Sequence, residues 1–293
     1  MTNTNTADLR ARIAWSLVAE PGSEPAALLI EEHGAAEALR RARGSGMRWR
    51  QQCSERQIDD VLALASKHGL EPLLPGDDRW PAGLAELGHR QPWMLWTKGD
   101  QGLLGTTTLA VTGARACTGY GSHATAEIVD GVSEQGITVL AGGAYGIDAA
   151  VHRSALSNGR PTVTVLAGGL DRPYPAAHAQ LLERIAMSGL VVSEMPPGTA
   201  PTRWRFLMRS RLMAALGGAL LVTEAGARSG SLAAAGEAAD LSKPVGALPG
   251  PVTSAASAGC HLLIRDHGAR LVTSAADALA LVASGSRTEG AAS

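Results

Sequence analysis

The sequence is poor in the residues that mark several common protein classes. Aromatic residues make up only 3% of its 293 residues, and it has 3 cysteines, Cys53, Cys117 and Cys260. Their odd number and wide spacing argue against a disulfide framework and against a cysteine-based metal site. We therefore expect a cytoplasmic protein without a bound metal, because free cysteines fit a reducing compartment.

Strong net charge and long apolar runs are absent as well. The formal net charge is −1, so a nucleic acid or other polyanion would have to meet a local basic patch. No apolar run is long enough to span a bilayer, and the opening stretch MTNTNTADLR lacks the basic-then-apolar pattern of a signal peptide. We expect no membrane association. With 45% hydrophobic and 18% charged residues, the chain can bury a sizeable core.

The motifs of common enzymes and cofactor sites are also missing. The stretch GARACTGYG at residues 113–121 is not a G-x-G-x-x-G, and no P-loop, G-x-S-x-G or H-E-x-x-H occurs. We therefore expect no cofactor and no enzymatic activity. Asp148 and His152, four residues apart on a predicted helix, could form an acid–base pair. We favour a structural role for them, because no nucleophile accompanies them in the sequence.

The pattern along the chain predicts a small helical domain, a connector and an α/β domain. Residues 1–70 show helical spacing, with Ser54 as a predicted N-cap and Gly69 after the end of a helix. Residues 71–105 are rich in proline and glycine, which indicates a connector with short strands. Over residues 106–284, short aliphatic runs alternate with helical segments, which predicts a parallel sheet with crossover helices on both faces. For residues 285–293 we expect a disordered tail.

Three of the predicted strands end in glycine-rich turns. Parallel strands end at one edge of the sheet, and ligands bind at that edge. Tight turns after strands need glycine in any case, but three of them at one edge favour a phosphate site. Arg115 could clamp a phosphate there, although it could also be an ordinary surface arginine. The turn residues are Gly113, Ala114 and Arg115; Gly142, Gly143, Ala144 and Gly146; and Gly168 and Gly169.

An arginine-rich segment follows further along the chain. The stretch PTRWRFLMRSRLMAAL places Trp204 and Phe206 among four arginines, which are Arg203, Arg205, Arg209 and Arg211. If a helix begins near Arg205, then Arg205 and Arg209 share one of its faces. Guanidinium groups beside aromatic rings suit single-stranded nucleic acid, whose phosphates pair and whose bases stack. The alternative is a solvated helix face with the two aromatic residues in the core.

Several long stretches together resemble one known family. VTGARACTGYG, GGAYGIDAAVHRSAL, SEMPPGTAPTRWRFLMRSRLMAAL and VTEAGARSGSLAAAGEAADLSKPVGALPG occur in the order found in the DNA-processing protein family, DprA, also called Smf. The resemblance covers about residues 71–272. Combined motifs of this length are far more specific than a single glycine turn.

The resemblance implies an extended Rossmann-like domain that binds single-stranded DNA. It also implies a homodimer that helps to load the recombinase RecA onto this DNA in natural transformation, with no known enzymatic activity. The helical N-terminus is similar to a small domain of some members. The residues expected to contact DNA are Gly113, Arg115, Gly142, Gly143, Ala144, Gly146, Arg153, Gly168, Arg205, Arg209, Arg211, Ser229 and Ser231.

Two departures from the family and two alternatives accompany this interpretation. Ser210 stands where the family usually has asparagine, and we expect no C-terminal winged-helix domain of the kind that many members carry. A related nucleotide-binding family cleaves nucleoside monophosphates to base and phosphoribose, but its PGGxGTxxE signature is absent here. A protein that binds a nucleotide signal in the glycine turns is the other alternative.

Overall fold

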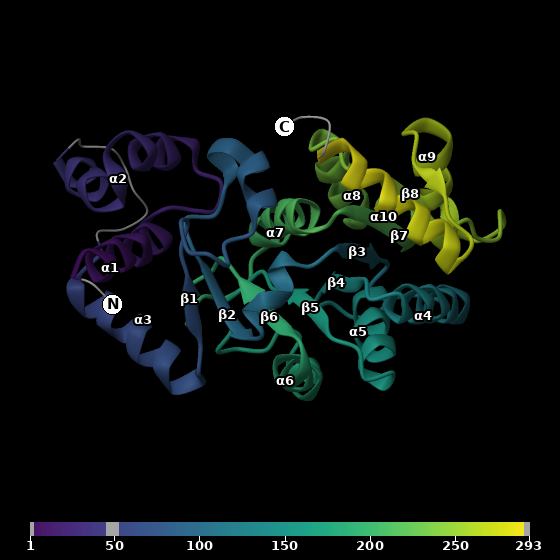
Figure 1. The fold of residues 1–293 in the computed structure, drawn as a ribbon, viewed down its shortest axis with the longest axis horizontal. Helices are drawn as coiled ribbons and strands as arrows, with labels where there is room; N and C mark the ends of the chain where they lie inside the picture. Colours follow the sequence, from purple (N-terminus) through teal and green to yellow (C-terminus); the bar gives the residue numbers. More distant parts are fainter. Residues whose placement is uncertain (1–2, 45–52, 290–293) are drawn as a thin grey trace.

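A computed structural model describes residues 3–44 and 53–289, which include one mixed sheet of nine strands (Figure 1). The aliphatic runs of the sequence form these strands, and all residues of β4 and β7 are buried, as expected for strands covered on both faces. The strands are β1 (Glu71–Leu73), β2 (Leu95–Gly99), β3 (Thr108–Gly113), β4 (Thr138–Gly142), β5 (Thr162–Val165), β6 (Leu190–Ser193), β7 (Ala219–Glu224), β8 (Val245–Ala247) and β9 (Arg270–Leu271).

The order of the strands defines where the chain reverses direction across the sheet. The order is β1-β2-β6-β5-β4-β3-β7-β8-β9. The strands from β6 to β9 in this order pair in parallel, whereas β1 and β2 add to one edge in antiparallel fashion. β3 is the first parallel strand in the chain and lies between β4 and β7, so the topological switch point is at β3. The predicted α/β, Rossmann-like fold is confirmed.

Helices cover both faces of this sheet. The helices are α1 (Asn3–Val18), α2 (Glu24–Gly44), α3 (Glu55–His68), α4 (Gly119–Glu134), α5 (Ile147–Ser157), α6 (Ala179–Ser188), α7 (Arg203–Leu216), α8 (Ser231–Asp240), α9 (Ala258–Asp266) and α10 (Ala275–Glu289), with 3-10 turns at Ala82–Arg90, Gln101–Gly105, Ala176–His178 and Ala255–Ser257. Figure 1 shows α7 and α8 above the sheet and α4, α5 and α6 below it. Leu212 and Met213 of α7 pack in one core, whereas Ile128 and Val151 pack in the core of the opposite face.

The helical N-terminal region has a core of its own at the β1 end of the sheet (Figure 1). The fully buried Trp15 lies in this core and donates a hydrogen bond from its ring nitrogen to the Ala35 carbonyl, 3.0 Å away. Ser54 forms a capping box with Gln57 at the start of α3, and Gly69 adopts left-handed geometry after its end. Both predicted ends of this helix are therefore found.

Two predicted boundaries differ from the structure. The stretch 71–105 does not form a separate connector, because its two strands β1 and β2 pair with each other and with β6 in the main sheet. Helix α10 continues to Glu289, beyond the predicted boundary at residue 284. The remainder of the predicted tail, 290–293, lies outside the described residues. Among the helices in the described ranges, none is both long and apolar enough to cross a membrane.

Candidate nucleic-acid interface

The three predicted glycine turns lie next to one another. They follow β3, β4 and β5, which are neighbours in the sheet and point the same way. The structure therefore brings together turns that are widely separated in the sequence. This arrangement follows from the parallel pairing that the aliphatic runs predicted.

Several turn glycines are required for packing within the protein itself. A β-carbon at Gly113 would lie 2.6 Å from Ile147 Cγ1, and one at Gly168 would lie 3.0 Å from the Pro201 ring. Gly146 has φ +74°, and a β-carbon there would collide with the carbonyl oxygens of Ala114 and Arg115. Among the glycines of this turn, positive φ falls on Gly146 and not on Gly143.

Two buried histidines fix the turn after β4. His152 Nε2 donates to the Gly142 carbonyl at 2.9 Å, and His178 Nδ1 donates to the Gly143 carbonyl at 3.0 Å. Burial lowers the pKa of His152 to about 4, so its ring is neutral near pH 7. The two rings orient the turn.

Asp148 holds the same turn from the other side. Its carboxylate accepts hydrogen bonds from the Thr112 hydroxyl at 3.1 Å and from the Ala144 amide at 3.2 Å, and it lies 3.8 Å from the Arg209 guanidinium. The Ala144 amide, predicted to contact DNA, is therefore used within the protein. These contacts support the structural interpretation of Asp148 and His152, because each of them bonds to the turn.

Arg209 is a buried cation whose hydrogen bonds are incomplete. Only 9% of the residue is exposed, and its Nε has no hydrogen-bond partner within residues 3–44 and 53–289. Burial lowers the pKa of Arg209, Asp148 opposes this change, and the nearby Arg115 adds to it. Binding of an anion stabilises such a buried guanidinium. The water that would hydrate it has already been removed on folding, so little further desolvation opposes the new bond.

Phe206 connects Arg209 to the first glycine turn. The guanidinium carbon of Arg115 lies 4.8 Å from the centroid of the Phe206 ring, and that of Arg209 lies 5.6 Å from it. Tyr174 packs on the same ring with a centroid distance of 5.7 Å. Arg115 is exposed and forms no ion pair with any described residue. Two cations and two aromatic rings therefore meet at the carboxyl edge of the sheet.

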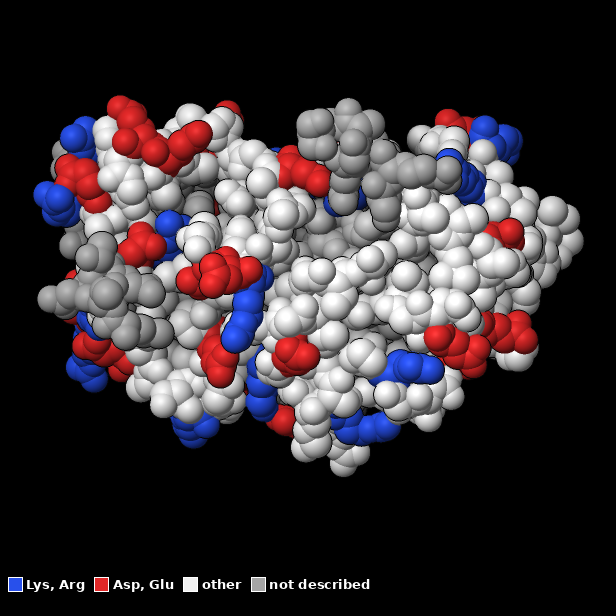
Figure 2. Space-filling view, in the orientation of Figure 1, with Lys and Arg blue, Asp and Glu red and all other residues white. Residues whose placement is uncertain are grey.

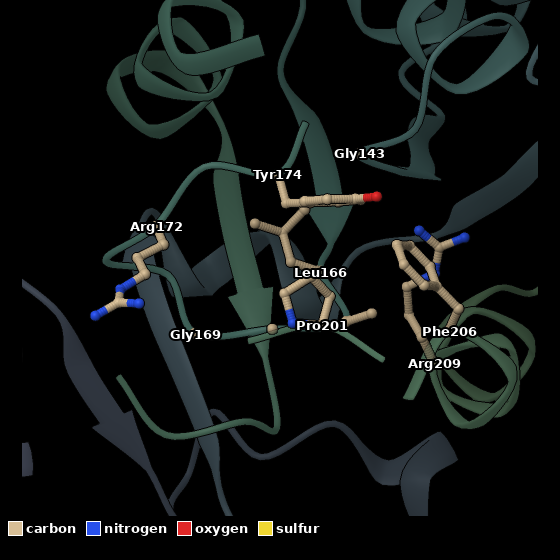
Figure 3. Close-up of a pocket in the computed structure, with 10 residues that line it drawn as sticks. Gly143, Leu166, Gly169, Arg172, Tyr174, Pro201, Phe206 and Arg209 are labelled. Atoms are coloured by element: carbon tan, nitrogen blue, oxygen red, sulfur yellow. The ribbon is translucent and has the colours of Figure 1, made fainter. Parts of the chain in front are cut away.

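Arg209, Phe206 and Tyr174 line a small pocket, which we call the arginine–aromatic pocket, whereas Arg115 is not among its lining residues (Figure 3). In Figure 3, Arg209 lies beside Phe206 with its guanidinium directed toward Gly143, and Arg172 points away from the other side chains. A β-carbon at Gly143 would lie 2.5 Å from Leu166 Cδ2, so this glycine keeps the pocket wall close to the turn. The lining residues are Gly143, Leu166, Ala167, Gly168, Gly169, Arg172, Tyr174, Pro201, Phe206 and Arg209.

Arg205 and Arg211, which were expected to contact DNA together with Arg209, do not line this pocket. Arg205 bonds to the Glu20 carboxylate at 3.1 Å and to the Ala200 carbonyl at 2.7 Å. Arg211 is completely buried and binds both carboxylate oxygens of Glu194, at 2.7 and 2.6 Å. Both guanidinium groups are satisfied within the protein.

The remaining predicted contacts lie away from the arginine–aromatic pocket. Arg153 is exposed on α5. Its positive charge opposes the rise that burial causes in the pKa of the Cys117 thiol, next to the first turn. Ser229 and Ser231 share a hydrogen bond of 2.7 Å between their hydroxyls at the start of α8, which follows β7 on the other side of β3. None of these residues lines the pocket, so they can contact DNA only if the bound strand extends beyond the pocket.

Sequence reasoning did not select the tyrosines of this edge. The chain has 3 tyrosines, and Tyr120, Tyr145 and Tyr174 are 45%, 49% and 50% exposed. Each follows one of three neighbouring strands, and Tyr145 also packs edge-on against His178 at a centroid distance of 4.7 Å. The available signal was their position in the segments that follow strand ends, in a chain with few aromatic residues. Exposed aromatic rings at a sheet edge suit nucleic-acid bases.

The fold and site define a Rossmann-like α/β protein with an arginine–aromatic pocket beyond its strand ends. No group of three or more potential metal ligands is assembled among the residues that the structure describes. The family model of DNA recombination-mediator protein A matches residues 71–283. The chain therefore belongs to this family, whose curated members carry the names DprA and Smf.

Similar proteins support this assignment over most of the chain. A putative DNA processing protein DprA of Mycobacterium tuberculosis strain H37Rv is 44% identical over 290 residues, which covers 92% of this chain and 74% of the relative. DNA processing protein DprA of Streptococcus pneumoniae strain R6 is 40% identical over 224 residues, covering 76% and 78% of the two chains.

Two solved structures have the same fold. The X-ray structure of DprA from Streptococcus pneumoniae matches with a TM-score of 0.79 and 31% identity, covering 96% of this chain and 98% of the other. A structure of DNA processing protein A from Helicobacter pylori, described for its single-stranded DNA binding mode, matches with a TM-score of 0.65 and 27% identity, covering 71% and 93%.

Proposed function

We propose that this protein binds single-stranded DNA in the arginine–aromatic pocket. The observation that carries the proposal is the buried guanidinium of Arg209, whose Nε is unsatisfied and whose nearest carboxylate oxygen, on Asp148, is 3.8 Å away. In the pocket, a phosphate oxygen would accept hydrogen bonds from the terminal nitrogens of this guanidinium and add a negative charge beside a cation that burial has destabilised. The binding mode described for the Helicobacter pylori relative supports the same kind of ligand.

Phosphate binding depends on two cations with different surroundings. Arg209 is buried, whereas Arg115 is exposed and approaches the same Phe206 ring from the turn after β3. On the face shown in Figure 2, acidic and basic side chains of the described residues are interspersed rather than separated by sign. Because the chain's formal net charge is −1, the attraction has to come from these local cations. Affinity should fall steeply with salt, because bound phosphates release counterions.

Base stacking favours a single strand over a duplex. Tyr174 and Phe206 line the pocket with an interplanar angle of 56°, and Trp204 on the same helix as Phe206 is 50% exposed. A base can lie on such rings only when it is unpaired. Duplex DNA offers its phosphates but keeps its bases stacked, so it lacks this part of the binding energy.

We also propose that the protein acts by binding and not by turnover. Asp148 and His152 bond to the turn after β4 and so have structural partners. As the family resemblance implies, the bound strand is protected and passed to a RecA recombinase, and the protein acts as a homodimer in the cytoplasm. Co-purification of RecA with the DNA-bound protein and analytical ultracentrifugation test the partner and the oligomeric state.

Fluorescence anisotropy with a labelled single-stranded oligonucleotide tests the site. Arg209→Ala should lose most of the affinity, since it removes the buried cation. Arg265→Ala removes an exposed arginine that pairs with Asp266 on α9, and it should bind like the wild type. Equal affinity of a folded Arg209→Ala variant and the wild type would show that DNA binds elsewhere.

A further inference from the structure

A carboxylate of the protein occupies the N-terminus of helix α4. Glu224, at the end of β7, is 2% exposed. Its oxygens accept hydrogen bonds from the Thr118 amide at 2.7 Å and from the Thr118 hydroxyl at 2.6 Å. Thr118 is the N-cap of α4, and its hydroxyl in turn accepts from the Gly121 amide at 3.1 Å. The chain thus places an anion at the positive end of this helix.

This position is the one at which Rossmann folds hold the diphosphate of a nucleotide. There, the helix that follows the first parallel strand presents its N-terminal amides to the pyrophosphate at the topological switch point. In this protein β3 is that strand, α4 is that helix, and β7 is the neighbour of β3 across the switch point. Glu224 therefore extends from β7 into this diphosphate position at the N-terminus of α4, which we call the α4 seat.

The local sequence is built to admit the carboxylate. A β-carbon at Gly121 would lie 2.6 Å from Glu224 Oε2, so a side chain at this position would displace the carboxylate. The helix α4 has 16 residues, long enough for a substantial dipole. The glycine that a nucleotide fingerprint would use for ligand approach is used here for the approach of Glu224.

We propose that Glu224 is a specificity determinant that excludes nucleotide phosphates from the α4 seat. Its carboxylate satisfies the Thr118 donors and repels a second anion at the same place. Anion binding is then confined to the arginine–aromatic pocket, beside β4 and β5. This last consequence rests on the proposed function, whereas the exclusion of nucleotides from the α4 seat does not.

Isothermal titration calorimetry with inorganic pyrophosphate, and separately with ADP, tests the proposal. The wild type should show no saturable binding at the α4 seat. Glu224→Ala should open the seat and add a saturable pyrophosphate-binding event that the wild type lacks. Glu127→Ala, which removes an exposed carboxylate of the same helix, is the matched control and should behave like the wild type.

Two results would overturn the proposal: equally tight pyrophosphate binding by the wild type and Glu224→Ala, or no gain by the folded variant. Circular dichroism reports whether the variant folds, and Glu224→Ser, which keeps one hydroxyl for hydrogen bonding, carries the test if alanine does not fold. Single-strand binding is measured separately on the wild type. Its absence would defeat the proposed function, and a gain of pyrophosphate binding would still support the role of Glu224.

Discussion

The guanidinium carbon of Arg115 lies 4.8 Å from the centroid of the Phe206 ring, which links the turn after β3 to helix α7. The ring also lies 5.6 Å from the guanidinium carbon of Arg209. One aromatic side chain therefore keeps two cations at the edge of the sheet without neutralising either of them. A cation over a ring is attracted by its quadrupole and keeps its full charge for a phosphate.

Replacement of Arg115 should weaken binding to all single-stranded sequences to a similar extent. Arg115→Ala removes a contact to the backbone and none to a base edge, so the slope of log affinity against log salt should fall by roughly one unit. Anisotropy titrations at several salt concentrations measure this slope. Arg265→Ala is again the charge-matched control, and an unchanged slope in Arg115→Ala would remove this residue from the site.

Loss of the Phe206 ring should reduce affinity through stacking. Phe206→Ala is expected to cost about 1–3 kcal/mol of binding free energy for each base stacked on the ring. Leu207→Ala removes a neighbouring exposed apolar side chain of the same helix and should have little effect. If both variants lose the same affinity, the effect belongs to the helix and not to the ring.

Arg205 should affect stability more than DNA binding. Its ion pair with Glu20, at 3.1 Å, joins the loop after α1 to the start of α7. Arg205→Ala leaves Glu20 without this partner and should lower the free energy of unfolding by about 1–3 kcal/mol, since the pair is only partly buried. Urea unfolding of the single variants and of the double variant with Glu20→Ala measures the coupling. If Arg205→Ala keeps normal stability but loses DNA binding, Arg205 contacts DNA and the structural assignment is wrong.

The buried His152 should make the protein less stable in mild acid. Burial lowers its pKa from 6.5 to about 4 in the folded state. The unfolded chain therefore takes up a proton first as the pH falls. Stability is lost progressively below about pH 6.5 and should fall by about 2 kcal/mol between pH 7 and pH 5.

Urea unfolding at these two pH values checks the contribution of His152. His152→Gln should be destabilised at pH 7, because it loses the bond to the Gly142 carbonyl, but it should lack this part of the pH dependence. His123→Gln, at an exposed position on α4, should retain it. Equal pH dependence in His152→Gln and the wild type would contradict the assignment.

The strand–turn–helix units could be predicted from the sequence because aliphatic runs and glycine turns are local signals. Their common edge follows from parallel pairing, so the sequence predicts Arg115 and Gly143 in neighbouring turns. The ion pairs of Arg205 and Arg211 could not be predicted. Glu20, the partner of Arg205, is distant in the sequence, and Glu194, the partner of Arg211, lies in the loop after β6. Arginines of one helix therefore serve two different roles: Arg205 and Arg211 form ion pairs within the protein, and Arg209 lines the pocket.

Side-chain burial accounts for the other differences. Tyr174 joins the pocket only because its loop folds back against Phe206, and no local pattern encodes that contact. Gly121 makes room for Glu224, which stands on another strand. Both contacts join residues far apart in the sequence, and such contacts are beyond the reach of periodicity and turn chemistry.

Competition binding on the wild-type protein tests most directly whether the pocket holds a single strand. A labelled single-stranded oligonucleotide is bound at low salt, and unlabelled single strand, duplex of the same sequence, and a nucleoside monophosphate are added in separate titrations. We predict that the unlabelled single strand displaces the label, that duplex does so only at much higher concentration, and that the mononucleotide does not displace it. Displacement by the mononucleotide at concentrations similar to the single strand, or equal competition by duplex, would contradict single-strand recognition by this pocket.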